Sequence, residues 1–254
     1  MIIRKSPEEL ERMRRAGRIV AGTISAVLDA VRPGATTADL DEVAESYIHE
    51  QNAVPSFKGY RGTYPATICA SIDDEIVHGI PSPARTLEEG QLLSLDFGAI
   101  WEGFHADSAV SVFVGGVSPS EEAAKLMKTT EEALYAGIGA VQPGGRLSDI
   151  GHAIESVAET AGLGIVREYG GHGIGRSLHE DPFIQNFGRP GRGPDLRPGL
   201  VIAIEPMLML GEERTRVLAD EWTVVTDDGS LAAHFEHTVA VTENGPEVLT
   251  ARRD

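Results

Sequence analysis

The sequence contains a single cysteine, no long apolar run and far fewer basic than acidic residues. Because Cys69 stands alone, no disulfide can form within the chain. The apolar runs are too short to cross a bilayer, and residues 1–5 lead into a polar segment rather than the apolar part of a signal peptide. A formal net charge of −17 argues against broad binding to polyanions, which requires a basic surface. We therefore expect a cytoplasmic protein with no membrane partner and no direct contact with DNA.

The overall composition is typical of a folded globular chain. With 254 residues, 41% of them hydrophobic and 24% charged, the chain can bury a large core as one large domain or two small ones. Its one basic cluster consists of Arg12, Arg14, Arg15 and Arg18, and acidic residues are interleaved with it. This mixture is typical of a solvated helix face rather than a docking patch.

Local signals predict two helices near the N-terminus and three strands after them. A serine, a proline and two glutamates at 6–9 are typical of a helix start, and this helix should run to Val31, where a Pro-Gly pair follows. A threonine at 36 or 37 should begin a second helix that ends near Gln51. The predicted strands are 66–71, and 91–99 with 104–114 as a hairpin around 100–103.

An internal repeat follows from comparing the two halves of the chain. Residues 26–46 and 136–156 share eight identical residues at an offset of 110, and each copy has two helical segments separated by Pro-Gly. The identical pairs are Ala26/Ala136, Ala30/Ala140, Val31/Val141, Pro33/Pro143, Gly34/Gly144, Asp39/Asp149, Glu45/Glu155 and Ser46/Ser156. Residues 92–96 likewise correspond to 201–205, and 106–110 to 235–239. We interpret 1–254 as a single α+β domain duplicated internally, with halves of about 7–118 and 119–250.

Each half supplies two acids from apolar, strand-like segments and one histidine beside a glycine: Asp96, Asp107 and His78 from the first, Glu205, Glu236 and His172 from the second. A pseudo-two-fold axis would bring them together at the centre of one sheet. Four carboxylates in a low-dielectric core repel one another, and two divalent cations would remove that repulsion. Oxygen-rich ligands with an imidazole suit Mn(II), Fe(II), Co(II) or Zn(II), and a pair of such ions can activate water for hydrolysis. Any single acid, taken alone, would be better explained by a structural role as a cap or in a salt bridge, and only the set indicates a metal site.

The motifs that surround these residues occur in a fixed order. They are Val77-His78-Gly79-Ile80-Pro81, Asp96 with Asp107 eleven residues later, Gly171 to Glu180, Ile204-Glu205-Pro206-Met207 and Phe235-Glu236-His237-Thr238. With them the chain resembles the type I methionine aminopeptidases, M24-type metallopeptidases of pita-bread fold, over nearly its whole length. The resemblance implies an α+β fold of two pseudo-symmetric halves, with a central antiparallel sheet covered by helices.

The same resemblance implies two divalent metal ions (Co, Mn, Fe or Zn) and a place for each ligand. Asp107 and Glu236 would bridge the two ions. His172 and Glu205 would complete one metal site, and Asp96 would chelate the other ion.

The resemblance also assigns catalytic roles to three residues. Glu205 would be the general base for the water that bridges the two ions. His78 and His179 would contact the substrate peptide as the tetrahedral intermediate forms. Taken alone, His78 would be interpreted as an ordinary loop histidine.

A pocket for a methionine side chain should be apolar and adaptable. The substrate-binding positions implied by the resemblance are His78, Tyr60, Tyr64, Cys69, Leu178, His179 and Trp222. Trp222 has the alternative interpretation of an ordinary core residue. The chain departs from the family at Arg61, where a histidine is common in a loop one residue shorter, and at Leu178, where an aromatic residue is common.

The implied function is removal of the N-terminal methionine from nascent proteins whose second residue is small. We expect nascent polypeptide N-termini as partners, a monomeric enzyme and at most a weak, transient ribosome contact through the arginine-containing helix face at 12–18. One alternative is a proline-specific aminopeptidase of the same fold, which usually carries an additional N-terminal domain that this chain has no room for. The other is a non-catalytic pita-bread binding protein, which would be expected to have lost metal ligands.

Overall fold

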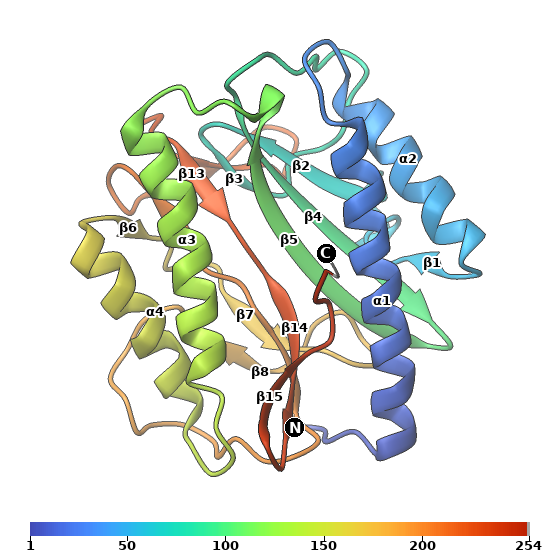
Figure 1. Ribbon diagram of the computed structural model, residues 1–254, viewed down its shortest axis with the longest axis vertical. Helices are drawn as coiled ribbons and strands as arrows, with labels where there is room; N and C mark the ends of the chain where they lie inside the picture. The colour runs from blue at the N-terminus through green and yellow to red at the C-terminus, as the bar shows by residue number, and fades with distance from the viewer. Residues whose placement is uncertain (253–254) are drawn as a thin grey trace.

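The computed structural model describes residues 1–252. Its long helices form two packed pairs, α1 Pro7–Ala30 with α2 Thr37–Glu50, and α3 Glu121–Gly139 with α4 Leu147–Ala161. In Figure 1 the first pair lies to the right of the central strands and the second to the left. Among the described residues, no helix is both long enough and apolar enough to cross a bilayer.

Local capping contacts fix where the first two helices begin. The Ser6 hydroxyl accepts the N–H of Glu9, and the Glu9 carboxylate accepts the N–H of Ser6. Thr36 and Asp39 form the same reciprocal pair at the start of α2. Both predicted helix starts are confirmed, with the earlier of the two candidate threonines as the cap. The first helix ends at Ala30, one residue before the predicted end.

The strands are short outside one long hairpin. They are β1 Val54–Pro55, β2 Ile68–Ile72, β3 Glu75–Val77, β4 Leu92–Trp101, β5 Phe104–Phe113, β6 Gly164–Ile165, β7 Gly171–Gly173, β8 Glu180–Ile184, β9 Val201–Ile204, β10 Met207–Met209, β11 Thr215–Val217, β12 Val224–Thr226, β13 Ala232–His234, β14 His237–Thr242 and β15 Gly245–Val248. Two short 3₁₀ turns are η1 Tyr60–Gly62 and η2 Val114–Gly116.

The predicted hairpin is present, but its first strand continues two residues further, its second ends one residue earlier and its turn is tighter than expected. Only Glu102 and Gly103 form the turn between β4 and β5, with φ of 45° and 78°. Two successive residues in the left-handed region give a tight turn whose twist matches that of the flanking strands. The predicted turn over 100–103 is therefore wrong in its first two residues, which belong to β4. The strand predicted at 66–71 begins two residues later, at Ile68.

Every strand pair that the structure describes is antiparallel. One sheet has the order β1-β4-β2 with β5 added on β4, and another has the order β15-β14-β9-β7-β8. Two three-stranded sheets, β13-β10-β6 and β11-β12-β3, flank them. The two large sheets meet where Ala109 and Glu236 exchange backbone hydrogen bonds of 3.3 and 3.0 Å, and β5 and β14 run side by side there in Figure 1. The expected central antiparallel sheet is thus a composite of two sheets.

The helices cover one face of the composite sheet, and the polar groups of β4 lie on the other face. On β4, Leu93, Leu95 and Phe97 belong to the same buried apolar cluster as the inner faces of the helices. Because side chains alternate along a strand, Ser94 and Asp96 point to the opposite face. The fold is α+β as expected, and the acids lie on the side of the sheet away from the helices.

Candidate metal centre

The two acids of the first half are neighbours across the β4–β5 hairpin. Asp96 pairs with Ala109 and Asp107 pairs with Gly98. In an antiparallel ladder this register makes the two aspartates diagonal neighbours on one face, within reach of a shared ligand. The tight hairpin turn therefore determines how these two carboxylates face each other.

The two acids of the second half lie beside strands rather than within them. Glu205 follows the last residue of β9, and Pro206, which has no N–H to donate, ends that strand. Glu236 lies in the break between β13 and β14, where its backbone pairs with Ala109 of the other sheet. The prediction that both glutamates come from strands is therefore wrong, although both carboxylates reach the same site as the aspartates.

His172 lies on β7 with both ring nitrogens accounted for. Nδ1 contacts the carbonyl oxygen of Gly173 at 2.9 Å, and a carbonyl can only accept, so Nδ1 carries the proton. In the neutral ring Nε2 then presents a lone pair, as a metal ligand must. It lies 3.6 Å from Glu205 Oε1 and 3.9 Å from Asp107 Oδ2, too far for hydrogen bonds.

Glycine is required on both sides of this histidine. A Cβ at Gly171 would lie 2.3 Å from the carbonyl oxygen of Ala203, and one at Gly173 would lie 2.2 Å from that of Asp181. Both distances are far below contact with backbone that cannot move aside. The glycines thus let three strands approach closely around the imidazole.

The donor set fits divalent cations. Ligand atoms of Asp107, His172 and Glu236 all lie within 4.8 Å of one another, and all three side chains are buried. Among residues 1–252, Asp96 Oδ1, Asp107 Oδ1 and Glu236 Oε1 are buried oxygens without a hydrogen-bond partner. Buried acceptors are normally satisfied, so their convergence on one point indicates that a cation belongs between them.

Burial raises the pKa of all four carboxyl groups, and repulsion from neighbouring acids raises that of three of them further. For Asp96 burial raises the pKa to about 7. Burial, and then repulsion from neighbouring acids of the cluster, raises the pKa of Asp107, Glu205 and Glu236 well above the ordinary range. Burial, and then the proximity of His179, lowers the pKa of His172 to about 3, which keeps its ring neutral. The metal-free cluster is electrostatically unfavourable in its fully ionised form.

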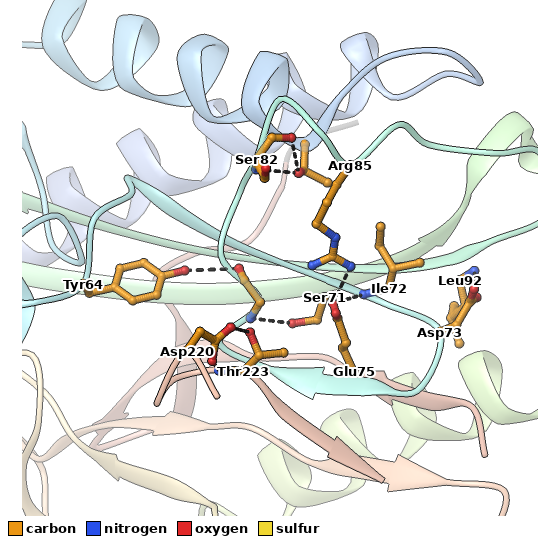
Figure 2. A network of polar contacts seen from close by, with 12 residues as sticks. Tyr64, Ser71, Ile72, Asp73, Glu75, Ser82, Arg85, Leu92, Asp220 and Thr223 are labelled. Atoms are coloured by element: carbon orange, nitrogen blue, oxygen red, sulfur yellow. Dashed lines mark hydrogen bonds and ion pairs between the residues drawn. The ribbon is translucent and has the colours of Figure 1, made fainter. Parts of the chain in front are cut away.

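His78 follows β3 with φ of 62°, and the next residue anchors it. Gly79 donates its N–H to Ser71 Oγ at 3.1 Å, and its carbonyl accepts the Tyr64 hydroxyl at 3.2 Å; Figure 2 shows both contacts. A Cβ at Gly79 would lie 2.3 Å from the carbonyl oxygen of Ala70. The tightly packed backbone therefore holds His78 in the left-handed region, and this conformation fixes where its imidazole lies.

The loop after His78 is tied at its far end as well. Arg85 donates to Glu75 at 2.7 Å, and the same carboxylate oxygen accepts the N–H of Ile72. Ser82 and Thr37 exchange hydrogen bonds of 2.9 and 3.2 Å, which joins the loop to α2. Figure 2 shows this chain of contacts from β2 to the loop and the helix.

Burial, and then His179, lowers the pKa of His78 to about 4, so its ring is neutral near pH 7.

His179 lies beside the candidate metal ligand His172. Its Nδ1 lies 2.7 Å from the Tyr60 hydroxyl, and its ring centroid is 4.1 Å from that of His172. Burial, and then the charge of Arg61, lowers the pKa of His179, which favours the neutral ring. In the tautomer in which Tyr60 donates to Nδ1, the proton of the neutral ring lies on Nε2 and is available as a donor.

All predicted site residues line one cavity of about 520 Å³. It contains Tyr60, Tyr64, Cys69, His78, Asp96, Asp107, His172, Leu178, His179, Glu205, Trp222 and Glu236. Trp222 packs edge-on against Tyr64 at 5.0 Å and against His78 at 6.2 Å, so it is part of the cavity wall. Burial raises the pKa of the Cys69 thiol well above its ordinary value, which makes it a wall rather than a nucleophile.

Comparison with known proteins agrees with this geometry. Residues 11–243 match metallopeptidase family M24. The methionine aminopeptidase of Clostridium acetobutylicum is 52% identical over 250 residues, 98% of this chain and 99% of that protein. The chain belongs to the methionine aminopeptidases of family M24. It is a hydrolase that acts on the N-terminal methionine of polypeptides.

Two further relatives support the assignment to these aminopeptidases. Methionine aminopeptidase 1 of Mycobacterium tuberculosis is 53% identical over 256 residues, 98% of this chain and 95% of that protein. The crystal structure of the Thermotoga maritima methionine aminopeptidase superposes with a TM-score of 0.96 at 42% identity, over 99% of this chain and 100% of that one. The expected pita-bread fold is thereby confirmed. Identity at this level over whole chains favours the aminopeptidase over the proline-specific and non-catalytic alternatives.

The cavity of this aminopeptidase also contains residues that the sequence did not single out. Phe57, Glu168, Tyr169 and Phe183 line it, and no local pattern marks them. His234 was missed although a signal existed, because it precedes Glu236 by two residues and such residues share a face of an extended segment. Its Nε2 is buried without a hydrogen-bond partner among the described residues and lies 3.6 Å from Glu205 Oε2.

The electrostatics of the cluster predict how the metal-free enzyme responds to pH. Folding raises the pKa of Asp96 to about 7 from its ordinary 3.8, so the folded state holds this proton more tightly than the unfolded chain. That contribution to stability is fully present below pH 3.8 and is lost as the pH rises through about 7. Asp96→Asn should therefore raise the free energy of unfolding at pH 8 by at most about 4 kcal/mol, at 1.36 kcal/mol per pKa unit, and at pH 5 by less than half as much, because the folded state still holds the proton there.

Urea unfolding in the presence of a chelator at both pH values measures this difference. Asp29→Asn, at an exposed position of α1, is the control and should behave alike at pH 5 and pH 8. An Asp96→Asn protein that is less stable than wild type at pH 8 would contradict the electrostatic account of the cluster.

Proposed function

We propose that the enzyme removes the initiator methionine from nascent chains whose second residue is small, and that it does so with two divalent ions. The observation that carries this proposal is the convergence of four carboxylates, two buried and two nearly so, and one neutral imidazole in an otherwise mainly apolar cavity. Asp107 and Glu236 lie between the two halves of the ligand set and are the candidates to bridge both ions. His172 and Glu205 would complete one site, and Asp96 the other.

Cobalt, manganese, iron and zinc all accept such mixed oxygen and nitrogen ligands. When bound, divalent cations supply Lewis-acid chemistry that polarises the scissile carbonyl and activates water. Glu205 is placed to accept the proton of the attacking water, since its Oε1 faces the cluster next to His172 Nε2. The raised pKa of Glu205 in the metal-free site then falls toward a useful range once cations offset the neighbouring negative charges.

Two neutral histidines would act on the peptide itself. In the tautomer in which Tyr60 donates to His179 Nδ1, the ring carries its proton on Nε2 and would donate it to the carbonyl oxygen as negative charge develops there. His78 faces the same cavity beside Trp222 and can hold the peptide nitrogen that follows the cleaved bond. Both rings are neutral near pH 7 because burial lowers their pKa.

The apolar part of the cavity accounts for methionine specificity. Tyr64, Cys69, Leu178 and Trp222 line it, and all but Trp222 are nearly inaccessible to solvent. A thioether side chain is unbranched and polarizable and fits a pocket walled by aromatic rings and a thiol. The cluster lies next to this pocket, so a bulky second residue of the substrate would collide with the ligand-bearing walls.

Hydrolysis of short peptides separates this proposal from a proline-specific activity. With Mn(II) or Co(II), the enzyme should cleave Met-Ala peptides with a kcat/KM at least roughly 10²-fold higher than that for Xaa-Pro peptides, the range a shaped pocket provides. A chelator should abolish the activity, and metal analysis of freshly purified protein should identify the ion. Preference for Xaa-Pro peptides, or metal-loaded protein without any peptidase activity, would contradict the proposal.

The two halves are proposed to derive from duplication of one α+β unit. Asp107 and Ala109 correspond to Glu236 and Thr238 at an offset of 129. Thr238 Oγ1 accepts the N–H of Asp107 at 2.9 Å and donates to its carbonyl, while Ala109 and Glu236 pair through their backbones. These two contacts are related by exchange of the halves, as expected around a pseudo-two-fold axis.

An enzyme that acts on nascent chains would be cytoplasmic and would meet ribosomes only transiently. We also expect it to be a monomer. The face of α1 that would be used carries Arg12, Arg15 and Arg18 beside Trp101. Two of these arginines are already near acids, Arg12 at 3.5 Å from Glu102 and Arg18 within 3.7 Å of a glutamate of the same helix. Any association with ribosomal RNA through this face is therefore expected to be weak and sensitive to salt.

A further inference from the structure

The N-terminal segment of the chain lies against the turn that carries His179. This turn, residues 174–179, joins β7 to β8 and also carries Leu178 of the methionine pocket. Lys5, ahead of the first helix, donates its backbone N–H to the carbonyl of Gly199 at 2.7 Å. Its side chain is 3% exposed and ends 2.8 Å from Glu180, the first residue after the turn. A buried lysine with a single carboxylate partner in this position needs an explanation.

The Glu180 carboxylate closes the turn from within. One oxygen, Oε2, accepts the Lys5 ammonium. The other, Oε1, accepts the backbone N–H of Arg176 at 2.8 Å and that of Ser177 at 3.2 Å. A single side chain thus binds the middle of the turn to its end, immediately beside His179. The positive charge of Lys5 offsets the negative charge of the Glu180 carboxylate, so that this carboxylate can stay ionised and accept all three hydrogen bonds although it is largely buried.

The ion pair fits the turn without free space. A Cβ at Gly175 would lie 2.4 Å from Lys5 Cε and 2.7 Å from Glu180 Oε1, so the pair packs directly on the turn backbone. The carbonyl of Gly175 in turn accepts the N–H of His105 on β5 at 2.8 Å. The turn is therefore held between the N-terminal segment on one side and the strand that bears Asp107 on the other.

We propose that the buried Lys5–Glu180 ion pair is a positioning device for catalysis, which fixes the 174–179 turn so that the His179 ring faces the metal ligands. The inference rests on the proposed role of His179 toward the substrate carbonyl. Lys5 does not line the cavity. Glu180 is among the lining residues, but its two oxygens are taken by Lys5 and by the backbone N–H groups of Arg176 and Ser177, so both residues act through the backbone of the turn. A displacement of the His179 ring by about 1 Å is enough to lower the rate of a positioned reaction by as much as about 10²-fold.

The first test replaces Lys5 by an apolar residue of similar length. Lys5→Met leaves the Glu180 carboxylate buried without its partner, and the turn should rearrange to hydrate it. We expect kcat to fall by about 10- to 100-fold, while KM changes by less than about threefold and metal content per chain stays as in the wild type. Lys128→Met is the matched control, since it removes an exposed lysine–glutamate pair of 3.5 Å on α3 and should leave kcat unchanged.

A second substitution should rescue the first. In Lys5→Met/Glu180→Gln the amide oxygen can still accept the two backbone N–H groups, and no buried charge lacks a partner. This double variant should recover kcat to within about threefold of wild type. It keeps the test valid if Lys5→Met alone fails to fold, because it lacks the unpaired buried charge. Recovery of the melting temperature without recovery of kcat would overturn the inference.

A double-mutant cycle with His179 distinguishes positioning from general stabilisation. If the ion pair acts through His179, Lys5→Met should lower kcat no further in a His179→Ala background, whereas independent effects would multiply. Multiplicative effects, or a Lys5→Met enzyme that melts earlier but keeps full kcat, would overturn the positioning role alone. A His179→Ala enzyme with wild-type kcat would instead overturn the role proposed for His179, so the two failures are distinguishable.

Discussion

Replacing Glu236 by alanine should abolish hydrolysis and remove bound metal. Its Oε1 is buried without a hydrogen-bond partner among residues 1–252, and its ligand atom lies within 4.8 Å of those of Asp107 and His172. A carboxylate shared by both ions contributes to two binding sites at once, so its loss weakens both. We expect kcat/KM to fall by at least about 10³-fold, and metal content to fall below that of a variant that has lost a ligand of only one ion.

Two further variants make this test specific. Glu236→Gln keeps the shape of the side chain and removes its charge, and it should also lose most metal, because a neutral amide is a poor bridging ligand. Glu243→Ala removes an exposed acid at the end of β14 and should leave both activity and metal content unchanged. A Glu236→Ala enzyme within about tenfold of wild-type activity at full metal content would refute the bridging role.

Features that depend on neighbouring residues could be predicted from the sequence. The capping pair of Ser6 and Glu9 is three residues apart, so the start of α1 is visible without any tertiary information. The same holds for the hairpin that presents Asp96 and Asp107, because the strands are continuous with their own turn. Only the turn length was misjudged, since Ile100 and Trp101 continue the strand up to Glu102.

Features that depend on pairing between distant segments could not be predicted in detail. Glu236 lies outside a strand because its backbone bonds to Ala109, 127 residues earlier, rather than to a neighbour within its own sheet. Glu205 lies outside one because Pro206 cannot continue the ladder, a local cause that the apolar run before it obscured. The Lys5–Glu180 pair joins residues 175 apart, and nothing near either residue indicates the other.

The resemblance to a family identified the acids and histidines, and physical reasoning explains why they work only as a set. Each of the four carboxyl groups has its pKa raised by burial, which for a structural acid would be purely a cost. A protein tolerates this cost where a ligand of opposite charge repays it. His234, which was not predicted, lies behind this set with its buried Nε2 3.6 Å from Glu205 and without a hydrogen-bond partner among the described residues.

Replacing His179 by alanine should spare the metal and reduce the rate. The ring lies beside His172, with centroids 4.1 Å apart, but the Tyr60 hydroxyl contacts its Nδ1, and we propose that it acts on the substrate rather than on the ions. Loss of one donor to a developing oxyanion costs about 10²- to 10⁴-fold in kcat. Metal content measured on the same preparation should equal that of the wild type.

Tyr60→Phe is the graded companion to this variant. It removes the hydroxyl that contacts and orients His179 Nδ1 and leaves the imidazole in place, so kcat should fall by a smaller factor, about 3- to 30-fold, with KM for Met-Ala peptides nearly unchanged. In the His179→Ala background the hydroxyl has no partner, and Tyr60→Phe should have no further effect on kcat. If His179→Ala loses metal together with activity, His179 is a ligand rather than a substrate-binding residue, and the division between His172 and His179 is wrong.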